Sequence, residues 1–324
     1  MALLFTGDCH GDYRRFSKAM FPEQENMTKG DYVIVCGDFG YWTPSQEQEK
    51  MLDALDRLPF TLLFLDGNHE NHAALDRLEV QMWHGGTVHQ IRSSVYHLMR
   101  GQVYELDGKK IFTFGGASSH DVLGGILNRK DPEFTKKLDL LSECGISYRI
   151  EGESWWPREL PDEEEYREGY ANLERCGWKV DLIATHCCST TTMKKMNLPA
   201  YYRSDALTDY LDTVKEKCRF GRWYFGHYHD NIQYIDAQLL YEEIKELGEP
   251  DSVQKVGRAR YRVGETVYFT YGKEDAREGY GTVEWVDDHG TLGQEKEVSY
   301  DIVGIPCELP REKTLFKHIR ESKI

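Results

Sequence analysis

The sequence predicts an α/β protein in which largely parallel strands alternate with helices, followed by a small antiparallel β module at the C-terminal end. Three segments, at 2–20, 31–58 and 60–78, repeat one design: an apolar strand, then glycine with polar residues, then a stretch with helical spacing. Near-continuous apolar strands that alternate with amphipathic helices are typical of parallel β-α-β units covered on both faces. From about residue 251 the pattern changes to short β-type runs separated by glycine and aspartate turns, which favours a small barrel or antiparallel sheet.

The spacing of polar residues at the strand ends supports the parallel arrangement. Asp8, Asp38 and Asn68 are each 30 positions apart (8, 38 and 68), and one β-α-β unit takes roughly 30 residues. Open α/β sheets bind ligands at the carboxyl ends of their strands. We therefore expect these three residues, together with His10 and His69, at one edge of one sheet.

The middle of the chain changes character. Residues 95–117 read as antiparallel strands around an Asp107-Gly108 turn, so the sheet becomes mixed or gains a partner sheet. Residues 120–178 combine helices and long loops, and the acidic tract Asp162–Glu165 suits the positive end of a helix dipole.

Apolar strands return at 180–188 and 222–230. The first ends in His186 and the second ends in His227 and His229. Each histidine therefore follows an apolar strand, as Asp8 and Asp38 do.

The sequence divides into two expected domains. Gly248, Glu249 and Pro250 read as a linker, so we predict a first domain at 1–248 and a β-rich, barrel-like accessory module at 249–324. No metal-ligand spacing occurs in this module, and a packing extension is favoured over a role in binding or dimerisation.

Composition narrows the class of protein. The chain has 324 residues and a formal net charge of −15, which disfavours nucleic acid and anionic membranes as partners. It contains no apolar run of about 18 residues and no signal peptide pattern at its N-terminus. Its eight cysteines form no C-x-x-C pair, which favours reduced thiols and a cytoplasmic location. The sequence indicates no particular oligomeric state.

The polar residues at the predicted strand ends form a candidate dinuclear metal site. They offer imidazole nitrogens and carbonyl or carboxylate oxygens, which suit manganese, iron or zinc better than a cysteine-type structural zinc site. Two ions about 3.5 to 4 Å apart need a bridging carboxylate, and Asp38 is the natural bridge. We assign one ion to Asp8, His10, Asp38 and His229, and the other to Asp38, Asn68, His186 and His227.

The predicted site has the charge and the acid for phosphate ester hydrolysis. Two carboxylates against two divalent ions leave about +2, which favours an anionic phosphate ester. A water or hydroxide shared by both ions would be the in-line nucleophile, and His69 would protonate the departing alkoxide. Glu70 could orient His69, although it also suits a helix start.

Other polar residues are weaker candidates. Asp121 follows another strand end and could border the pocket, and Arg14, Arg15 and Arg129 could bind phosphate oxygens, although solvated positions are favoured for the arginines. Six further histidines are expected at the surface or in turns: His72, His84, His89, His97, His289 and His318.

Five motifs together resemble the calcineurin-like metallophosphoesterase superfamily, in that family's order. They are G-D-x-H-G at 7–11, G-D at 37–38, G-N-H-E at 67–70, a strand-end His186, and G-H-x-H at 226–229. The resemblance spans residues 1–235 and implies a four-layer α-β-β-α sandwich, a dinuclear metal centre and phosphoester hydrolysis. The second motif continues as GDFGYWTP, without the Asp and Arg of the protein Ser/Thr phosphatase branch, which argues against that branch.

These observations predict a metal-dependent phosphatase or phosphodiesterase acting on a small phosphorylated substrate. The reaction would be attack by a metal-bridging hydroxide on a phosphomonoester or phosphodiester, with His69 as general acid. Manganese is the favoured ion, and iron, zinc and nickel are also compatible. The alternative is a non-catalytic metal-binding scaffold that uses the C-terminal module for partners, but a proton donor beside a full ligand set favours the enzyme. A nuclease is disfavoured because no basic stripe is present.

Overall fold

The computed structural model divides the chain into two compact units. It describes residues 1–42, 45–196, 198, 202–234, 236–248, 256–271, 277–288, 297–306 and 314–324. The larger unit comprises Met1–Ser118, Ser154–Met193 and Ser204–Asp251, and the smaller unit comprises Ser119–Glu153, Lys194–Arg203 and Ser252–Ile324. The smaller unit therefore takes in two segments from the middle of the chain. The domain division at residue 248 stays a prediction, and the linker around it lies mostly outside the described residues.

The first sheet of the larger unit has seven strands in the order β15-β1-β2-β3-β6-β5-β4. Strands β1, β2, β3 and β6 are parallel, and β15, β5 and β4 extend the sheet in antiparallel fashion. The strands span β1 (Leu3–Thr6), β2 (Tyr32–Val35), β3 (Thr61–Phe64), β4 (Val80–Trp83), β5 (Gly86–Arg92), β6 (Val95–Leu98) and β15 (Lys245–Glu246).

The second sheet has six strands in the order β13-β14-β12-β11-β8-β7. Strands β8, β11, β12 and β14 are parallel, while β7 and β13 are antiparallel to their neighbours. The predicted turn joins β7 to β8, with Asp107 and Gly108 at φ 51° and 67°, as a tight hairpin requires. The strands span β7 (Gln102–Leu106), β8 (Lys109–Phe114), β11 (Leu182–Thr185), β12 (Arg222–Phe225), β13 (Ile232–Gln233) and β14 (Ala237–Leu239).

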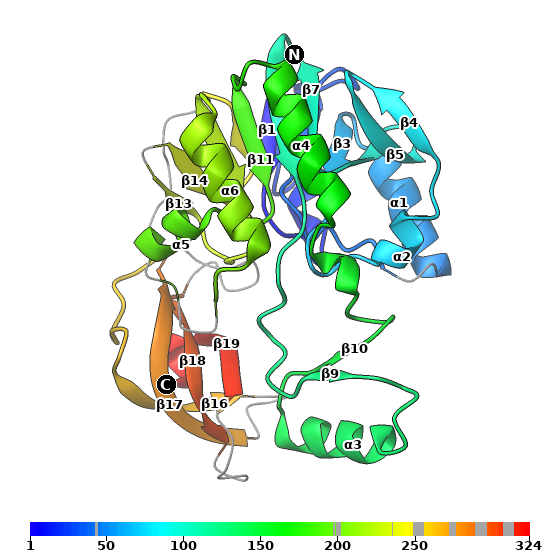
Figure 1. Cartoon of the computed structure of the whole chain (residues 1–324). Helices are drawn as coiled ribbons and strands as arrows, with labels where there is room; N and C mark the ends of the chain where they lie inside the picture. Colours follow the sequence, from blue (N-terminus) through cyan, green and yellow to red (C-terminus); the bar gives the residue numbers. More distant parts are fainter. Residues whose placement is uncertain are drawn as a thin grey trace. The chain divides into compact units, whose positions relative to one another are not determined.

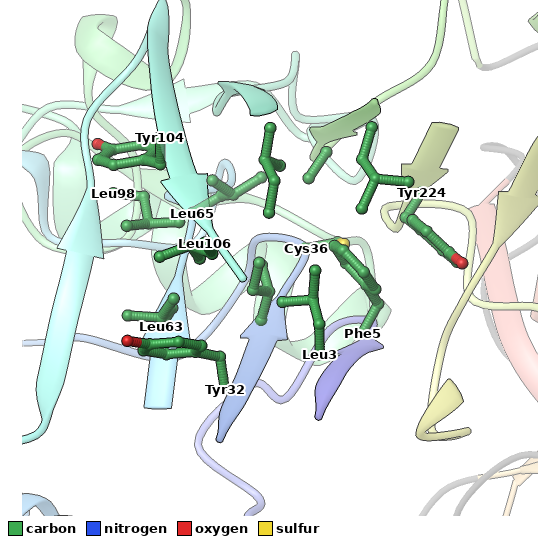
Figure 2. Packing of buried hydrophobic residues seen from close by; sticks show 14 of the residues in the cluster. Leu3, Phe5, Tyr32, Cys36, Leu63, Leu65, Leu98, Tyr104, Leu106 and Tyr224 are labelled. Carbon is green, nitrogen blue, oxygen red and sulfur yellow. The ribbon is translucent and has the colours of Figure 1, made fainter. Parts of the chain in front are cut away.

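The two sheets pack against each other through one apolar core (Figure 2). Side chains alternate along each strand, so Leu3 and Phe5 enter this core whereas Leu4 belongs to the core on the opposite face of the first sheet. Tyr224 of the second sheet stacks on Phe5, with ring centroids 4.0 Å apart. Strands buried on both faces explain the near-continuous apolar runs in the sequence.

Helices cover the outer faces of both sheets (Figure 1). Leu52, Leu55 and Leu75, from α1 and α2, pack on the first sheet, and Tyr166 of α4 and Tyr210 of α6 contact Phe114 of β8. The sandwich of helices around two sheets is therefore confirmed. The helices of this unit span α1 (Gln46–Asp56), α2 (His72–Leu75), α4 (Glu163–Arg175), α5 (Thr190–Met196, which ends in the smaller unit) and α6 (Ala206–Lys217).

Capping side chains fix where these helices begin. The predicted start at Asp162 is confirmed, since its carboxylate accepts the backbone N–H groups of Glu164 and Glu165. The helical spacing at 13–20 is not realised as an α-helix: that region holds the 3₁₀ turn η1 (Arg14–Phe16), followed by η2 (Pro22–Asn26), and a third 3₁₀ turn, η3, spans Pro157–Glu159. None of the described helices is both long and apolar enough to cross a membrane.

The smaller unit contains the predicted C-terminal antiparallel sheet, which is confirmed in the order β16-β17-β18-β19. Its core includes Phe269, Val283, Tyr300 and Ile302. The elements of this unit span β9 (Ile126–Leu127), α3 (Phe134–Cys144), β10 (Arg149–Ile150), β16 (Thr266–Tyr271), β17 (Arg277–Asp287), β18 (Ser299–Pro306), β19 (Thr314–Arg320) and η5 (Glu321–Lys323).

Candidate metal centre

The predicted ligands meet at the carboxyl ends of five strands drawn from both sheets. Strands β1, β2 and β3 supply the polar residues at 8–10, 38 and 68–69, and β11 and β12 supply those at 186 and 227–229. Three groups of side chains have ligand atoms within 4.8 Å of one another: Asp8, His10 and His229; His10, Asp38 and His69; and Asp38, His186 and His227. Because His10 and Asp38 each belong to two groups, the three form one continuous cluster.

The first group joins the β1 end to the β12 end. The Nε2 atoms of His10 and His229 lie 2.9 Å apart, and Asp8 Oδ2 lies 3.0 Å from His229 Nε2 and 3.7 Å from His10 Nε2. Two imidazole nitrogens at about 2.1 Å from one octahedral ion are about 3 Å apart. The spacing therefore suits two rings that share a cation.

The group around Asp38 is almost completely buried. Asp38 Oδ2 lies 3.4 Å from His186 Nε2, and Asn68 Oδ1 lies 3.2 Å from the same nitrogen. His186 Nδ1 is 2.8 Å from the carbonyl oxygen of Cys36. With its proton on Nδ1, the ring would donate a hydrogen bond to this carbonyl oxygen and leave Nε2 available to bind a metal ion. This arrangement is common among metal-binding histidines.

Electrostatics favour positive charge beside Asp38. Burial by itself would raise the pKa of the Asp38 carboxyl, but the neighbouring imidazoles, led by His186 and His69, hold that pKa well below its usual range. Burial works to lower the pKa of His186, and the Asp38 carboxylate overcomes this and raises it. The buried Asp38 carboxylate therefore stabilises positive charge at His186.

Both aspartates use one oxygen for the backbone and turn the other toward the imidazoles. Asp8 Oδ1 accepts the His227 backbone N–H at 2.9 Å, and Asp38 Oδ1 accepts that of His69 at 2.8 Å. Asp8 Oδ2 is buried, and although His229 Nε2 lies 3.0 Å away, this oxygen accepts no hydrogen bond of suitable geometry from the described residues. A buried carboxylate oxygen without a donor is costly, and a divalent cation at this point would satisfy it, so the residues fit the metal centre that the sequence predicts.

The backbone bends sharply at these positions. His10, Asp38, His227 and His229 have φ of 48°, 46°, 72° and 52°, a left-handed conformation that is uncommon for residues other than glycine and clusters at functional sites. Tight packing also explains a motif glycine, because a Cβ at Gly67 would lie 2.1 Å from Asp38 Oδ1.

Arg15 is buried beneath the site, so the expectation of a solvated arginine is wrong for this residue. Its guanidinium donates to the carbonyl oxygens of Gly7, Asp8 and Tyr241 at 3.2, 2.5 and 2.5 Å. The sequence does not reveal that Arg15 binds these three carbonyl oxygens, because no feature of the surrounding sequence distinguishes Arg15 from Arg14. Arg14 is exposed and pairs with Asp12 at 2.6 Å.

The other candidates and histidines have surroundings of their own. Asp121 belongs to the smaller unit and forms an ion pair with Arg149. His72, His89 and His97 are buried, at 4%, 4% and 5% exposure, so their expected surface positions are wrong. His289 lies outside the described residues.

Glu70 ties two ligand-bearing loops together. Its carboxylate accepts the backbone N–H groups of Gly40, at 2.8 Å, and Gly67, next to the loops that carry Asp38 and Asn68. Because an amide cannot accept at both positions, Glu70→Gln should leave one buried N–H facing an NH₂ group. We expect the free energy of unfolding to fall by about 1–3 kcal/mol, measured by urea denaturation of metal-free protein. An unchanged value would show that these two hydrogen bonds do not hold the loops.

Comparison with family models identifies the family of the chain. Residues 1–231 match the family model described as calcineurin-like phosphoesterase, and no curated protein is matched by the chain. A phosphopantetheinyl hydrolase from Mycobacterium tuberculosis is similar in structure at 15% identity and a TM-score of 0.39, covering 77% of this chain and 96% of its own. The family match includes every candidate ligand and all strands of the two sheets except β13, β14 and β15. The chain therefore belongs to the calcineurin-like phosphoesterase family.

Proposed function

We propose that the protein is a metal-dependent hydrolase that cleaves a phosphomonoester or phosphodiester with two divalent ions and His69 as general acid. The observation that carries this proposal is the continuous cluster at five strand ends, in which Asp38 lies between an outer group with His10 and an inner group with His186. Family membership supports the phosphoesterase class.

The chain's own residues would hold the ions as two overlapping sets. Asp8, His10, Asp38 and His229 would bind one ion, and Asp38, Asn68, His186 and His227 the other. When bound, such ions polarise phosphoryl oxygens and lower the pKa of a coordinated water. Manganese is the ion we propose first, with iron, zinc and nickel as alternatives, because nitrogen and oxygen ligands accept all four.

His69 is suited to hold and deliver a proton. Its side chain is 21% exposed whereas that of His186 is fully buried, and its Nε2 lies 3.9 Å from Asp38 Oδ2. Asp38 Oδ1 accepts the backbone N–H of His69, which fixes the loop beside the cluster. A protonated ring there would donate to the leaving-group oxygen of an ester bound at the cluster.

The substrate proposed is a small phosphorylated molecule, and the proposed location is the cytoplasm, as the reduced-thiol composition favours. None of the seven cysteines among the described residues forms a disulfide, which is compatible with that location. The residues that surround the cluster, rather than the cluster itself, would decide whether the protein cleaves monoesters or diesters.

Metal removal and replacement test the proposal. Metal-stripped protein should hydrolyse neither p-nitrophenyl phosphate nor bis-p-nitrophenyl phosphate, and adding Mn, Fe, Zn or Ni should restore turnover of at least one of them. The monoester-to-diester ratio then assigns the substrate class. Stoichiometric binding of two ions with no turnover of either ester would contradict the proposed activity and favour a metal-binding scaffold.

A further inference from the structure

A buried ion pair lies directly beside the loop that carries Asn68 and His69. Asp66 follows β3, is 2% exposed, and receives hydrogen bonds from Arg100 Nε at 2.8 Å and Nη2 at 2.5 Å. Arg100 is itself only 5% exposed. Both N–H groups donate to Asp66 Oδ2, and hydrogen bonds between charged partners such as these are stronger than those between neutral groups.

Arg100 continues this contact to a distant part of the chain. Its Nη2 donates to the carbonyl oxygen of Arg158 at 2.8 Å, and its Nη1 donates to Glu165 of α4 at 3.2 Å. Arg158 also binds the Glu165 carboxylate, at 2.9 Å. The buried charges are therefore compensated by several hydrogen bonds, which makes the network rigid rather than a source of unpaired charge.

Asp66 is also held by the loop that follows β8. Its carbonyl oxygen accepts the Gly116 backbone N–H at 2.8 Å, and a Cβ at Gly115 would lie 2.2 Å from Asp66 Oδ1. The chain leaves the larger unit after Ser118 and rejoins it at Ser154. Asp66 is therefore bound to Gly116 directly and to Arg158 through Arg100, and these two residues lie close to the two ends of segment 119–153.

A third side of Asp66 faces the buried histidines of the first sheet. His97 Nε2 lies 3.2 Å from Asp66 Oδ1, and the Nδ1 atoms of His97 and His89 lie 3.0 Å apart. His97 also contacts Phe64, the last residue of β3, through its ring at 5.1 Å. Both oxygens of Asp66 are therefore engaged, and this carboxylate belongs to none of the three metal-ligand groups.

We propose that the buried Asp66–Arg100 pair positions the Asn68–His69 loop. Through this pair the loop is bound near Gly116 and Arg158, which lie close to the two ends of segment 119–153. The loop is short: Gly67, Asn68 and His69 lie between Asp66 at one end and Glu70, bound to Gly40, at the other. With both ends fixed, Asn68 and His69 have little freedom to move. This inference rests on the proposed function, in which Asn68 holds one ion and His69 supplies the proton.

Asp66→Asn tests the proposal because the amide keeps the size of the side chain and removes its charge. In calorimetric titration of metal-stripped protein with Mn²⁺, the ion of the Asn68 set should bind about 10- to 100-fold more weakly, as for other residues that orient metal ligands, and the other ion should bind as in the wild type. Leu106→Ala is the matched control. Leu106 lies in the inter-sheet core and pairs with Lys109 at the start of β8, away from the strand ends that carry the ligands. The Leu106→Ala substitution should therefore lower the melting temperature while the affinities for both ions stay unchanged.

The outcomes separate positioning from general stability. Unchanged binding of both ions by Asp66→Asn, or equal weakening in Leu106→Ala at the same loss of melting temperature, would overturn the proposal. If Asp66→Asn does not fold, Asp66→Asn combined with Arg100→Gln removes both buried charges and should show the same selective loss. Asp66→Glu should restore part of the affinity. If the wild type binds two ions but hydrolyses no ester, the proposed function fails, and the metal titrations still decide the positioning role.

Discussion

Asp38→Asn should lose metal and activity together. The amide retains an oxygen for the His69 backbone N–H, which Asp38 Oδ1 accepts at 2.8 Å, so the loop geometry is preserved. It loses the negative charge shared by His10, His69 and His186, whose Nε2 atoms lie 3.8, 3.9 and 3.4 Å from Oδ2. We expect the number of ions bound per protein molecule to fall below two. We also expect kcat/KM to fall by about 10³-fold or more, which corresponds to a loss of about 4 kcal/mol of transition-state stabilisation.

Metal content by elemental analysis and steady-state kinetics at saturating Mn²⁺ measure this effect. The matched control is Asp53→Asn, which makes the same chemical change at an exposed carboxylate paired with Arg92, and which should keep both ions and full turnover. Retention of two tightly bound ions by Asp38→Asn would refute its role as the shared ligand.

His69→Ala should keep the metals and lose turnover in a way that depends on the leaving group. Because Asp38 binds the backbone N–H of residue 69, truncating the ring leaves that hydrogen bond in place. A general acid contributes roughly 10²- to 10⁴-fold, and its loss matters most when the departing alkoxide is a strong base. We expect a loss of about this size for alkyl phosphate esters and at most about 10-fold for p-nitrophenyl esters.

The slope of log kcat/KM against leaving-group pKa tests this assignment, since loss of the acid should make the slope steeper. His84→Ala, which removes an imidazole from the turn between β4 and β5, is the control and should leave the slope unchanged. An equal loss for good and poor leaving groups in His69→Ala would assign the residue to metal or substrate binding instead.

The sequence by itself determined the strands and the chemistry of their ends. Apolar runs such as those ending before Asp8, Asp38 and His186 can only be buried, and burial on both faces requires parallel strands under helices. Parallel strands of one sheet end at one edge, so the residues that follow β1, β2 and β3 must meet there. The strand ends at His186 and His227 belong to the other sheet, and their approach to this edge was decided by the packing of the two sheets.

Only the tertiary structure decided which polar residues are buried around that cluster. Arg15 and Arg14 are adjacent in sequence, yet one is 3% exposed and clamps three carbonyl oxygens while the side chain of the other is 63% exposed. Asp66 is stable in the interior because Arg100, 34 positions away, and beyond it Glu165, 65 positions further, come to it. A buried charge is tolerated only where other segments of the chain supply its partners. No local sequence pattern predicts which distant residues will become those partners.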